Sequence, residues 1–148
     1  MYPVFVKEAL RNLFFENYER KSVVPDGLQT ICVVDDDTSV LKALGRLLAS
    51  VGLRMMGFSD PRLFLEYARE HKVALAILDV WMSELSGFEV QRLLSTIAPS
   101  TPVIIMTARD DPGMDRIASS QGAVGFFTKP FNDSAFLDAI LRALPVAE

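Results

Sequence analysis

Short apolar runs alternate with longer segments of helical periodicity from about residue 30 onward. Runs of four or five apolar residues bounded by polar or turn residues predict strands that are buried on both faces, as in parallel sheets. Strands that alternate with helices form βαβ units, in which a helix connects each strand to a parallel neighbour. The pattern therefore predicts one doubly wound α/β domain.

The boundaries of these elements follow from the runs and from the turn residues beside them. Five strands are expected, at 30–34, 54–58, 75–79, 103–107 and 124–127, of which the second has the weakest pattern. Five helices are expected, at 38–50, 61–70, 87–97, 112–121 and 132–144. Asp37, Asp60 and Asn132 are the expected N-caps, since short polar side chains accept hydrogen bonds from the first turn of a helix.

Residues 1–28 depart from this alternation. They contain an apolar stripe at helical spacing, which predicts an added helical segment: Phe5, Ala9, Leu10, Leu13, Phe14 and Tyr18. We divide the chain into this N-terminal extension and a domain at 29–148. Three roles stay open for the extension, namely a helix docked on the domain, a free tail and a helix that binds a partner.

The composition excludes several classes of protein. Half of the 148 residues are hydrophobic, and the net charge of −4 offers no broad basic face for nucleic acid. No apolar run approaches the ~18 residues of a membrane span, and charged residues interrupt any signal peptide near the N-terminus. The single cysteine, Cys32, permits no internal disulfide. We expect a cytoplasmic protein that binds neither membrane nor, by this chain, nucleic acid directly.

Polar residues stand where four of the predicted strands end. Asp35 and Asp36 follow the first strand, Asp79 ends the third, Thr107 ends the fourth and Lys129 follows the fifth. In open α/β sheets, ligands bind outside the carboxyl ends of the strands. Carboxylates that repel one another favour a bound cation, and hard oxygen ligands suit Mg²⁺. The arrangement predicts a site for a divalent cation and a phosphoryl group.

Four motifs in this order resemble a two-component response-regulator receiver domain. They are Val33-Val34-Asp35-Asp36-Asp37, Leu78-Asp79-Val80-Trp81-Met82 with Gly87, Val103-Ile104-Ile105-Met106-Thr107-Ala108, and Gly125-Phe126-Phe127-Thr128-Lys129-Pro130-Phe131. The resemblance covers residues from about 30 to 144. It implies a flavodoxin-like, doubly wound five-stranded parallel sheet with the strand order 2-1-3-4-5 and five helices.

The resemblance also implies a role for each matching residue. Asp79 would be the phosphoacceptor, and Thr107 and Lys129 would contact the phosphoryl oxygens. Mg²⁺, or Mn²⁺ in its place, would be bound by Asp36, by Asp79, by the backbone carbonyl of Trp81 and by Asp35, the last mainly through a water. Phe126 occupies the place of the family's switch aromatic, which would turn inward together with Thr107.

A receiver accepts a phosphoryl group on itself and loses it again, so we expect a signalling module and not a turnover enzyme. The phosphoryl donor would be a sensor histidine kinase or a phosphotransfer protein. Phosphorylation would switch a surface made of residues 112–144, with a phosphorylation-dependent homodimer as one outcome. The sequence identifies neither the kinase, the signal, the oligomeric state nor the lifetime of the phosphoryl group. A role in transcription and an output domain beyond Glu148 stay open.

One residue departs from the family pattern inside the site region. Ser83 stands where the family usually has proline, which predicts a more mobile loop after Asp79.

Two other functions remain as alternatives to the receiver. Asp35-Asp36-Asp37 after an apolar strand also resembles the nucleophile motif of haloacid-dehalogenase phosphatases, with Asp35 as the nucleophile. That reading leaves Asp79 without a use, and the further strand that would carry additional acidic ligands is missing. The second alternative is a receiver that is never phosphorylated and acts only by docking. Labelling of Asp79 or of Asp35 separates these possibilities.

Overall fold

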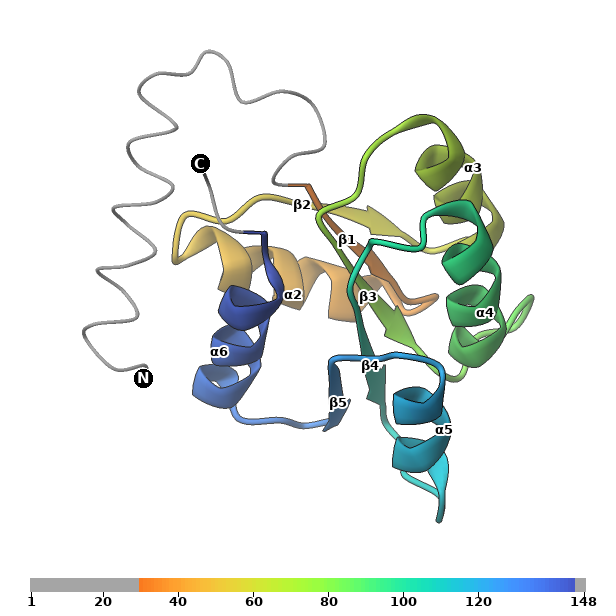
Figure 1. The fold of residues 1–148 in the computed structure, drawn as a ribbon. Coiled ribbons are helices and arrows are strands. Elements are labelled where there is room, and N and C mark those ends of the chain that lie inside the picture. The colour runs from red at the N-terminus through yellow and green to blue at the C-terminus, as the bar shows by residue number, and fades with distance from the viewer. Residues whose placement is uncertain (1–29, 146–148) are drawn as a thin grey trace.

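A five-stranded parallel sheet forms the centre of the molecule, which the computed structural model describes for residues 30–145 (Figure 1). The sheet has the order β2-β1-β3-β4-β5, and its strands are β1 (Ile31–Val34), β2 (Met55–Phe58), β3 (Leu75–Asp79), β4 (Val103–Thr107) and β5 (Gly125–Thr128). The flavodoxin-like order 2-1-3-4-5 is thus confirmed. The predicted extension at 1–28 lies outside the described residues.

Five helices cover the sheet in two layers. They are α2 (Thr38–Ala49), α3 (Pro61–Glu70), α4 (Gly87–Ile97), α5 (Met114–Ser120) and α6 (Asp133–Ala143). Helices α2 and α6 lie on one face of the sheet, and α3, α4 and α5 lie on the other (Figure 1). Each layer encloses its own apolar core, because successive side chains of a strand point to opposite faces of the sheet.

The inner strands and the edge strands differ in burial. Every residue of β1, β3 and β4 is buried, whereas β2 and β5 are partly exposed. The prediction of a fully buried strand before Lys129 is therefore wrong. The physical reason is position, since β5 pairs only with β4 and forms an edge of the sheet.

Helix starts follow the expected capping chemistry at three places. The side chains of Asp37, Asp60 and Asn132 each accept a hydrogen bond from a backbone N–H in the first turn of α2, α3 and α6. Helix α4 has a capping box that was not predicted, in which Ser86 and Glu89 each bond the other's backbone N–H.

Helix α5 begins later than predicted. The sequence favoured a start at Pro112, but the helix begins at Met114. Gly113 adopts φ +89°, a left-handed conformation that an α-helix interior does not contain, so the chain cannot turn helical before this residue. The segment from Ala108 to Gly113 is therefore a loop that lies beside Thr107, at the carboxyl end of β4.

The sole cysteine lies at the centre of this architecture. Cys32 is fully buried in β1, and burial raises the pKa of its thiol to about 12.

Among residues 30–145, no helix combines the length and the apolar character that a membrane crossing requires.

Candidate functional site

The fold brings three of the predicted carboxylates together. Asp35 follows β1 and Asp79 ends β3, and these two strands are neighbours in the sheet. Asp36 follows Asp35 at the start of the β1–α2 loop. One carboxylate oxygen from each of Asp35, Asp36 and Asp79 lies within 4.8 Å of the other two. Asp35 and Asp79 are buried, at 1% and 4% exposure, whereas Asp36 faces solvent.

Lys129 reaches this acidic cluster from the end of β5. Its Nζ donates a hydrogen bond to Asp35 Oδ2 at 2.7 Å and lies 3.1 Å from Asp79 Oδ1. The second contact lacks hydrogen-bond geometry and leaves Asp79 Oδ1 without a hydrogen-bond partner among the described residues, so we interpret it as an ion pair. Asp35 is held on both sides, because its Oδ1 accepts from the backbone N–H of Asp37 at 2.9 Å.

Burial and like charge shift the protonation of Asp79. Desolvation and the neighbouring carboxylate of Asp35 raise the pKa of Asp79 to about 6, although Lys129 acts in the opposite direction. Burial also opposes the charge on Lys129. The hydrogen bond to Asp35 and the charges of Asp79 and Asp35 outweigh that effect and raise the pKa of Lys129 above its ordinary value. The cluster therefore keeps its lysine charged and holds an excess of negative charge.

These residues fit a hard divalent cation. The one buried polar side-chain atom without a hydrogen-bond partner in the described residues is Asp79 Oδ1, and it belongs to the acidic cluster. All three side chains offer oxygen ligands, and the single ammonium does not neutralise three carboxylates. Oxygen ligands with room for water are the donor set of Mg²⁺. The contribution predicted for the Trp81 carbonyl stays a prediction.

Thr107 is completely buried at the end of β4, and its hydroxyl is already engaged. It donates to the carbonyl oxygen of Arg109 at 2.8 Å and accepts from the N–H of Arg109 at 3.1 Å. The same carbonyl accepts a hydrogen bond from the indole Nε1 of Trp81 at 3.2 Å. The guanidinium of Arg109 lies 4.0 Å from the centre of the Trp81 ring, a cation–π contact.

Arg109 was missed at the sequence level. It joins the loop after β3 to the loop after β4, because both Trp81 and Thr107 bond its backbone. No residue type signals such a role, since the hydrogen bonds go to a backbone carbonyl that every residue carries.

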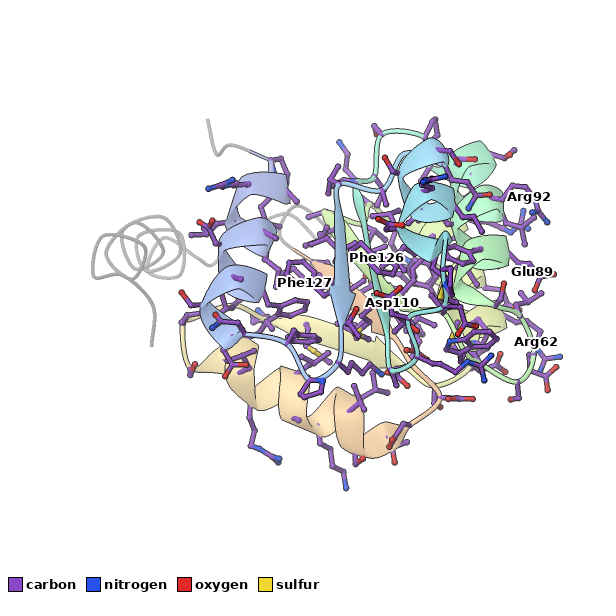
Figure 2. The ribbon with its side chains drawn as sticks, turned by 90° about the horizontal axis from the view of Figure 1, so that it is seen from below. Arg62, Glu89, Arg92, Asp110, Phe126 and Phe127 are labelled. Atoms are coloured by element: carbon purple, nitrogen blue, oxygen red, sulfur yellow. The ribbon has the colours of Figure 1, made fainter. Side chains whose placement is uncertain are left out.

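The aromatic pair on β5 divides between the two faces of the sheet. Phe126 packs against the core beneath α3, α4 and α5, and Phe127 packs against the core beneath α2 and α6 (Figure 2). Phe126 pairs with Ile105 in the sheet, two residues before Thr107. It is only partly buried, so its ring lies near the surface on the side of α5. The structure places the predicted switch pair on adjacent strands.

Gly87 places the start of α4 against the end of β3. A Cβ atom at this position would lie 2.3 Å from the carbonyl oxygen of Asp79, far inside any allowed contact. The N–H of Gly87 bonds the carbonyl of Val80 at 2.9 Å. Glycine is required here by the close approach of two backbones, which holds the start of α4 against the end of β3.

Comparison with known proteins assigns this arrangement to a family. The family model described as the response regulator receiver domain matches residues 31–141. The chain belongs to the response-regulator receiver family. Receivers are phosphoacceptor modules of two-component signalling, and this establishes the predicted class of function.

Individual relatives agree with that assignment. The chain is 41% identical over 122 residues to the response regulator protein TmoT of Ectopseudomonas mendocina, covering 82% of this chain and 56% of the relative. It is 32% identical over 114 residues to the transcriptional regulatory protein FixJ of Rhizobium meliloti, covering 77% of this chain and 56% of that protein. The chain thus spans about half the length of these relatives.

A solved structure shows the same fold. The beryllofluoride-activated NtrC4 receiver domain dimer superposes with a TM-score of 0.74 at 27% identity, covering 78% of this chain and 96% of that chain.

Proposed function

We propose that Asp79 is the phosphoacceptor of this receiver and that it takes a phosphoryl group from a histidine kinase or a phosphotransfer protein with the help of Mg²⁺. The observation that carries the proposal is that Asp79 belongs to a cluster of three carboxylates and lies 3.1 Å from the ammonium of Lys129. Asp79 would supply the nucleophilic oxygen, a cation bound by the acidic cluster would supply positive charge, and Lys129 would supply a second positive charge.

The chemistry is a transfer from nitrogen to oxygen. A carboxylate oxygen of Asp79 forms a bond to phosphorus, while the bond from phosphorus to the donor histidine breaks and its electron pair returns to the imidazole nitrogen. The product is an aspartyl phosphate. Such transfers have loose transition states, so positioning and neutralisation of charge supply most of the catalysis. Bound Mg²⁺ would neutralise part of the charge on the phosphoryl oxygens.

Different residues of the site would contact the phosphoryl group and bind the cation. Lys129 is held between Asp35 and Asp79 and so is placed to contact a phosphoryl oxygen on Asp79. Asp36 and Asp79 would bind the cation directly. Asp35 already uses both oxygens for Lys129 and the Asp37 N–H, which supports an indirect role through water. The cation chemistry adds no covalent step of its own.

Phosphorylation then acts as a switch. The new phosphoryl oxygens attract the Thr107 hydroxyl, which must give up the Arg109 carbonyl to reach them. A hydrogen bond to a charged group contributes about 1.5–3 kcal/mol. A shift from 1:99 to 99:1 would need about 5.5 kcal/mol. We therefore propose a partial shift of a pre-existing equilibrium, read out at Phe126 and on the surface of α5, β5 and α6.

The phosphatase alternative is disfavoured by a specific contact. Asp35, its proposed nucleophile, has hydrogen-bond partners on both oxygens, whereas Asp79 Oδ1 has none among the described residues. A nucleophile needs a free oxygen that faces the substrate. Membership in the receiver family also removes the motif argument on which that alternative rested.

The deciding experiment is chemical labelling of the full chain. Incubation with acetyl phosphate and Mg²⁺ should add one phosphoryl group that hydroxylamine releases, as shown by intact mass. Asp79→Asn should abolish the addition. Asp115→Asn, which removes an exposed carboxylate on α5, is the matched control and should be labelled normally. Labelling lost in Asp35→Asn but retained in Asp79→Asn would favour the phosphatase, and no labelling of the native chain would favour a docking module.

The wider role follows the relatives. A protein named as a transcriptional regulator contains a similar domain, and we propose that this chain likewise serves a cytoplasmic regulator of gene expression. It would receive its phosphoryl group from a partner kinase and pass the signal on by protein contacts and not by contacts of its own with DNA.

A further inference from the structure

The loop between Val80 and Ser86 contacts three other parts of the molecule. Trp81 bonds the Arg109 carbonyl in the loop after β4, as described above. Glu84 lies 3.8 Å from Arg62 at the start of α3, in an exposed ion pair. Between these two contacts, the backbone N–H of Ser83 donates a hydrogen bond to Asp36 Oδ2 at 3.2 Å. The middle contact is the one that reaches the acidic cluster.

Asp36 differs from the other two carboxylates in its support. Asp35 is buried and held by Lys129 and by the Asp37 N–H, and Asp79 is buried beside Lys129. Asp36 is exposed, and the Ser83 N–H is the single hydrogen-bond donor that the described residues provide to its side chain. An exposed carboxylate rotates freely unless a partner fixes it. The Ser83 N–H is therefore what orients Asp36.

The donor depends on the residue at position 83 in a specific way. Every residue except proline carries a backbone N–H, and proline is the residue that receivers usually have here. A chain with proline at this position could not form the bond. The serine that the sequence analysis singled out as a departure thus supplies a contact to the cation site that the family pattern lacks.

The geometry points to Ser83 as a positioning residue for the divalent cation, acting through its backbone N–H on Asp36. This inference rests on the proposed function, in which Asp36 binds the cation. The bond holds Asp36 Oδ2 in place and so limits the rotation of the whole carboxylate, including Oδ1. Less orientational freedom of this side chain is then lost when the cation binds. It also places a donor next to a group of anions, which lowers their mutual repulsion before the cation arrives.

The consequence is coupling between the loop and the cation. The same loop carries Trp81 and the carbonyl predicted to bind the cation. If Asp36 moves toward the cation, the hydrogen bond pulls Ser83 and the loop between Val80 and Ser86 toward the site. Hydrogen-bonded partners of metal ligands change metal affinity by about 10–100-fold when they are removed. The Ser83 contact is long and exposed, so an effect of about five- to tenfold is expected, at or below the lower end of that range.

The test compares Mg²⁺ affinity in two variants of the full chain. Ser83→Pro removes the N–H and should weaken Mg²⁺ about five- to tenfold. Ser83→Ala keeps the N–H and loses only the hydroxyl, and its affinity should stay within about twofold of the native value. Tryptophan fluorescence during a Mg²⁺ titration gives the affinity, and isothermal calorimetry gives it independently of Trp81. Circular dichroism and thermal unfolding without metal check that both variants fold.

A double-mutant cycle separates the proposed contact from a general effect of proline on the loop. In an Asp36→Ala background the acceptor of the Ser83 N–H is gone, so Ser83→Pro should change the remaining Mg²⁺ affinity by less than about twofold. An equal loss in both backgrounds would overturn the inference, as would a Ser83→Pro variant that binds Mg²⁺ as tightly as the native chain or more tightly. A native chain that binds no Mg²⁺ would overturn the proposed cation site itself, and this outcome is distinct from the others.

Discussion

The hydroxyl of Thr107 and the backbone of Arg109 bond each other in both directions, at 2.8 Å from the hydroxyl to the carbonyl and at 3.1 Å from the N–H to the hydroxyl. In this state Thr107 is satisfied without a phosphoryl group. A switch that moves Thr107 must break the first of these bonds. Because Trp81 bonds the same carbonyl, the environment of its indole should change when Thr107 leaves.

Thr107→Ala should separate phosphorylation from its readout. Acetyl phosphate should still label Asp79, because the hydroxyl is not the acceptor, but the change in Trp81 fluorescence on phosphorylation should be largely lost. Loss of the buried hydrogen bonds should also lower the free energy of unfolding by about 1 kcal/mol. Thr107→Ser keeps the hydroxyl and is the matched control. A full fluorescence response in Thr107→Ala would show that Trp81 senses the phosphoryl group without Thr107.

Asp79→Asn should stabilise the metal-free protein at pH 7.5. The folded-state pKa of Asp79 is raised from 3.8 to about 6, so between these values the folded state binds more protons than the unfolded state. The free energy of unfolding contributed by this group therefore falls as pH rises through that window. Asparagine carries no such cost, so the variant should be more stable by up to about 3 kcal/mol at pH 7.5.

Thermal unfolding in EDTA at pH 4.5 and 7.5 checks the sign. The advantage of Asp79→Asn should shrink at the lower pH, where the native carboxyl is protonated in the folded state. Asp115→Asn should keep the native pH dependence. An advantage that grows as pH falls would contradict the raised pKa.

Lys129→Ala should lower stability without metal and increase the stabilisation by Mg²⁺. The substitution leaves the buried carboxylate of Asp35 without its ammonium partner at 2.7 Å. Removing one partner of a buried pair costs about 3–5 kcal/mol, and the partial exposure of Lys129 places this site near the lower end. Calorimetric unfolding measures both effects when it is carried out without Mg²⁺ and again with enough Mg²⁺ to saturate the site.

Labelling should persist at a reduced level in Lys129→Ala, because the lysine contacts the phosphoryl group and does not accept it. Arg142→Ala on α6 is the control, since its ion pair with Asp138 is exposed. A Lys129→Ala chain as stable as the native one would show that the ion pair of Lys129 with Asp35 makes no net contribution to stability.

Phosphorylation should promote self-association through the surface of residues 112–144, which contains α5, β5 and α6. Ile117 and Val124 are apolar residues at 46% and 56% exposure on this surface, and an activated receiver of similar fold is a dimer. Ile117→Asp should therefore abolish the dimer that forms with acetyl phosphate. Leu93→Asp is the matched control, because Leu93 is comparably exposed at 42% but lies on α4. Analytical ultracentrifugation measures both.

Deletion of residues 1–28 tests the other candidate interface. A stable, phosphorylatable chain whose association is unchanged would show that the extension is dispensable and would assign any dimer to the surface of residues 112–144. Loss of a dimer that is already present without phosphate would assign it to the extension, and the proposed assembly surface would then be wrong.

The topology and the acidic cluster could be predicted because they follow from order along the chain. Parallel strands place their carboxyl ends at one edge, so Asp35, Asp79 and Lys129 had to meet once the strands were recognised. The capping box of Ser86 and Glu89 was also visible as a serine followed three residues later by a glutamate, although it was not used.

The contacts of the loops could not be predicted in this way. The Ser83 N–H and the Arg109 carbonyl are backbone groups, and their partners lie 47 and 28 positions away in the sequence. Their positions depend on loop conformation, which no periodicity encodes. The late start of α5 depends on the left-handed conformation of Gly113. From the sequence alone, a glycine that follows a proline does not indicate whether the helix begins before or after it.

The deep position of the sole thiol has a practical consequence for kinetics. Cys32 sits in β1 with strands on both sides and a thiol that stays protonated, so a reagent reaches it only when the sheet opens. Its rate of alkylation in native buffer therefore measures how often the whole molecule opens. A cysteine introduced at the surface would react far faster, so dyes could be attached at chosen positions without first removing the native thiol.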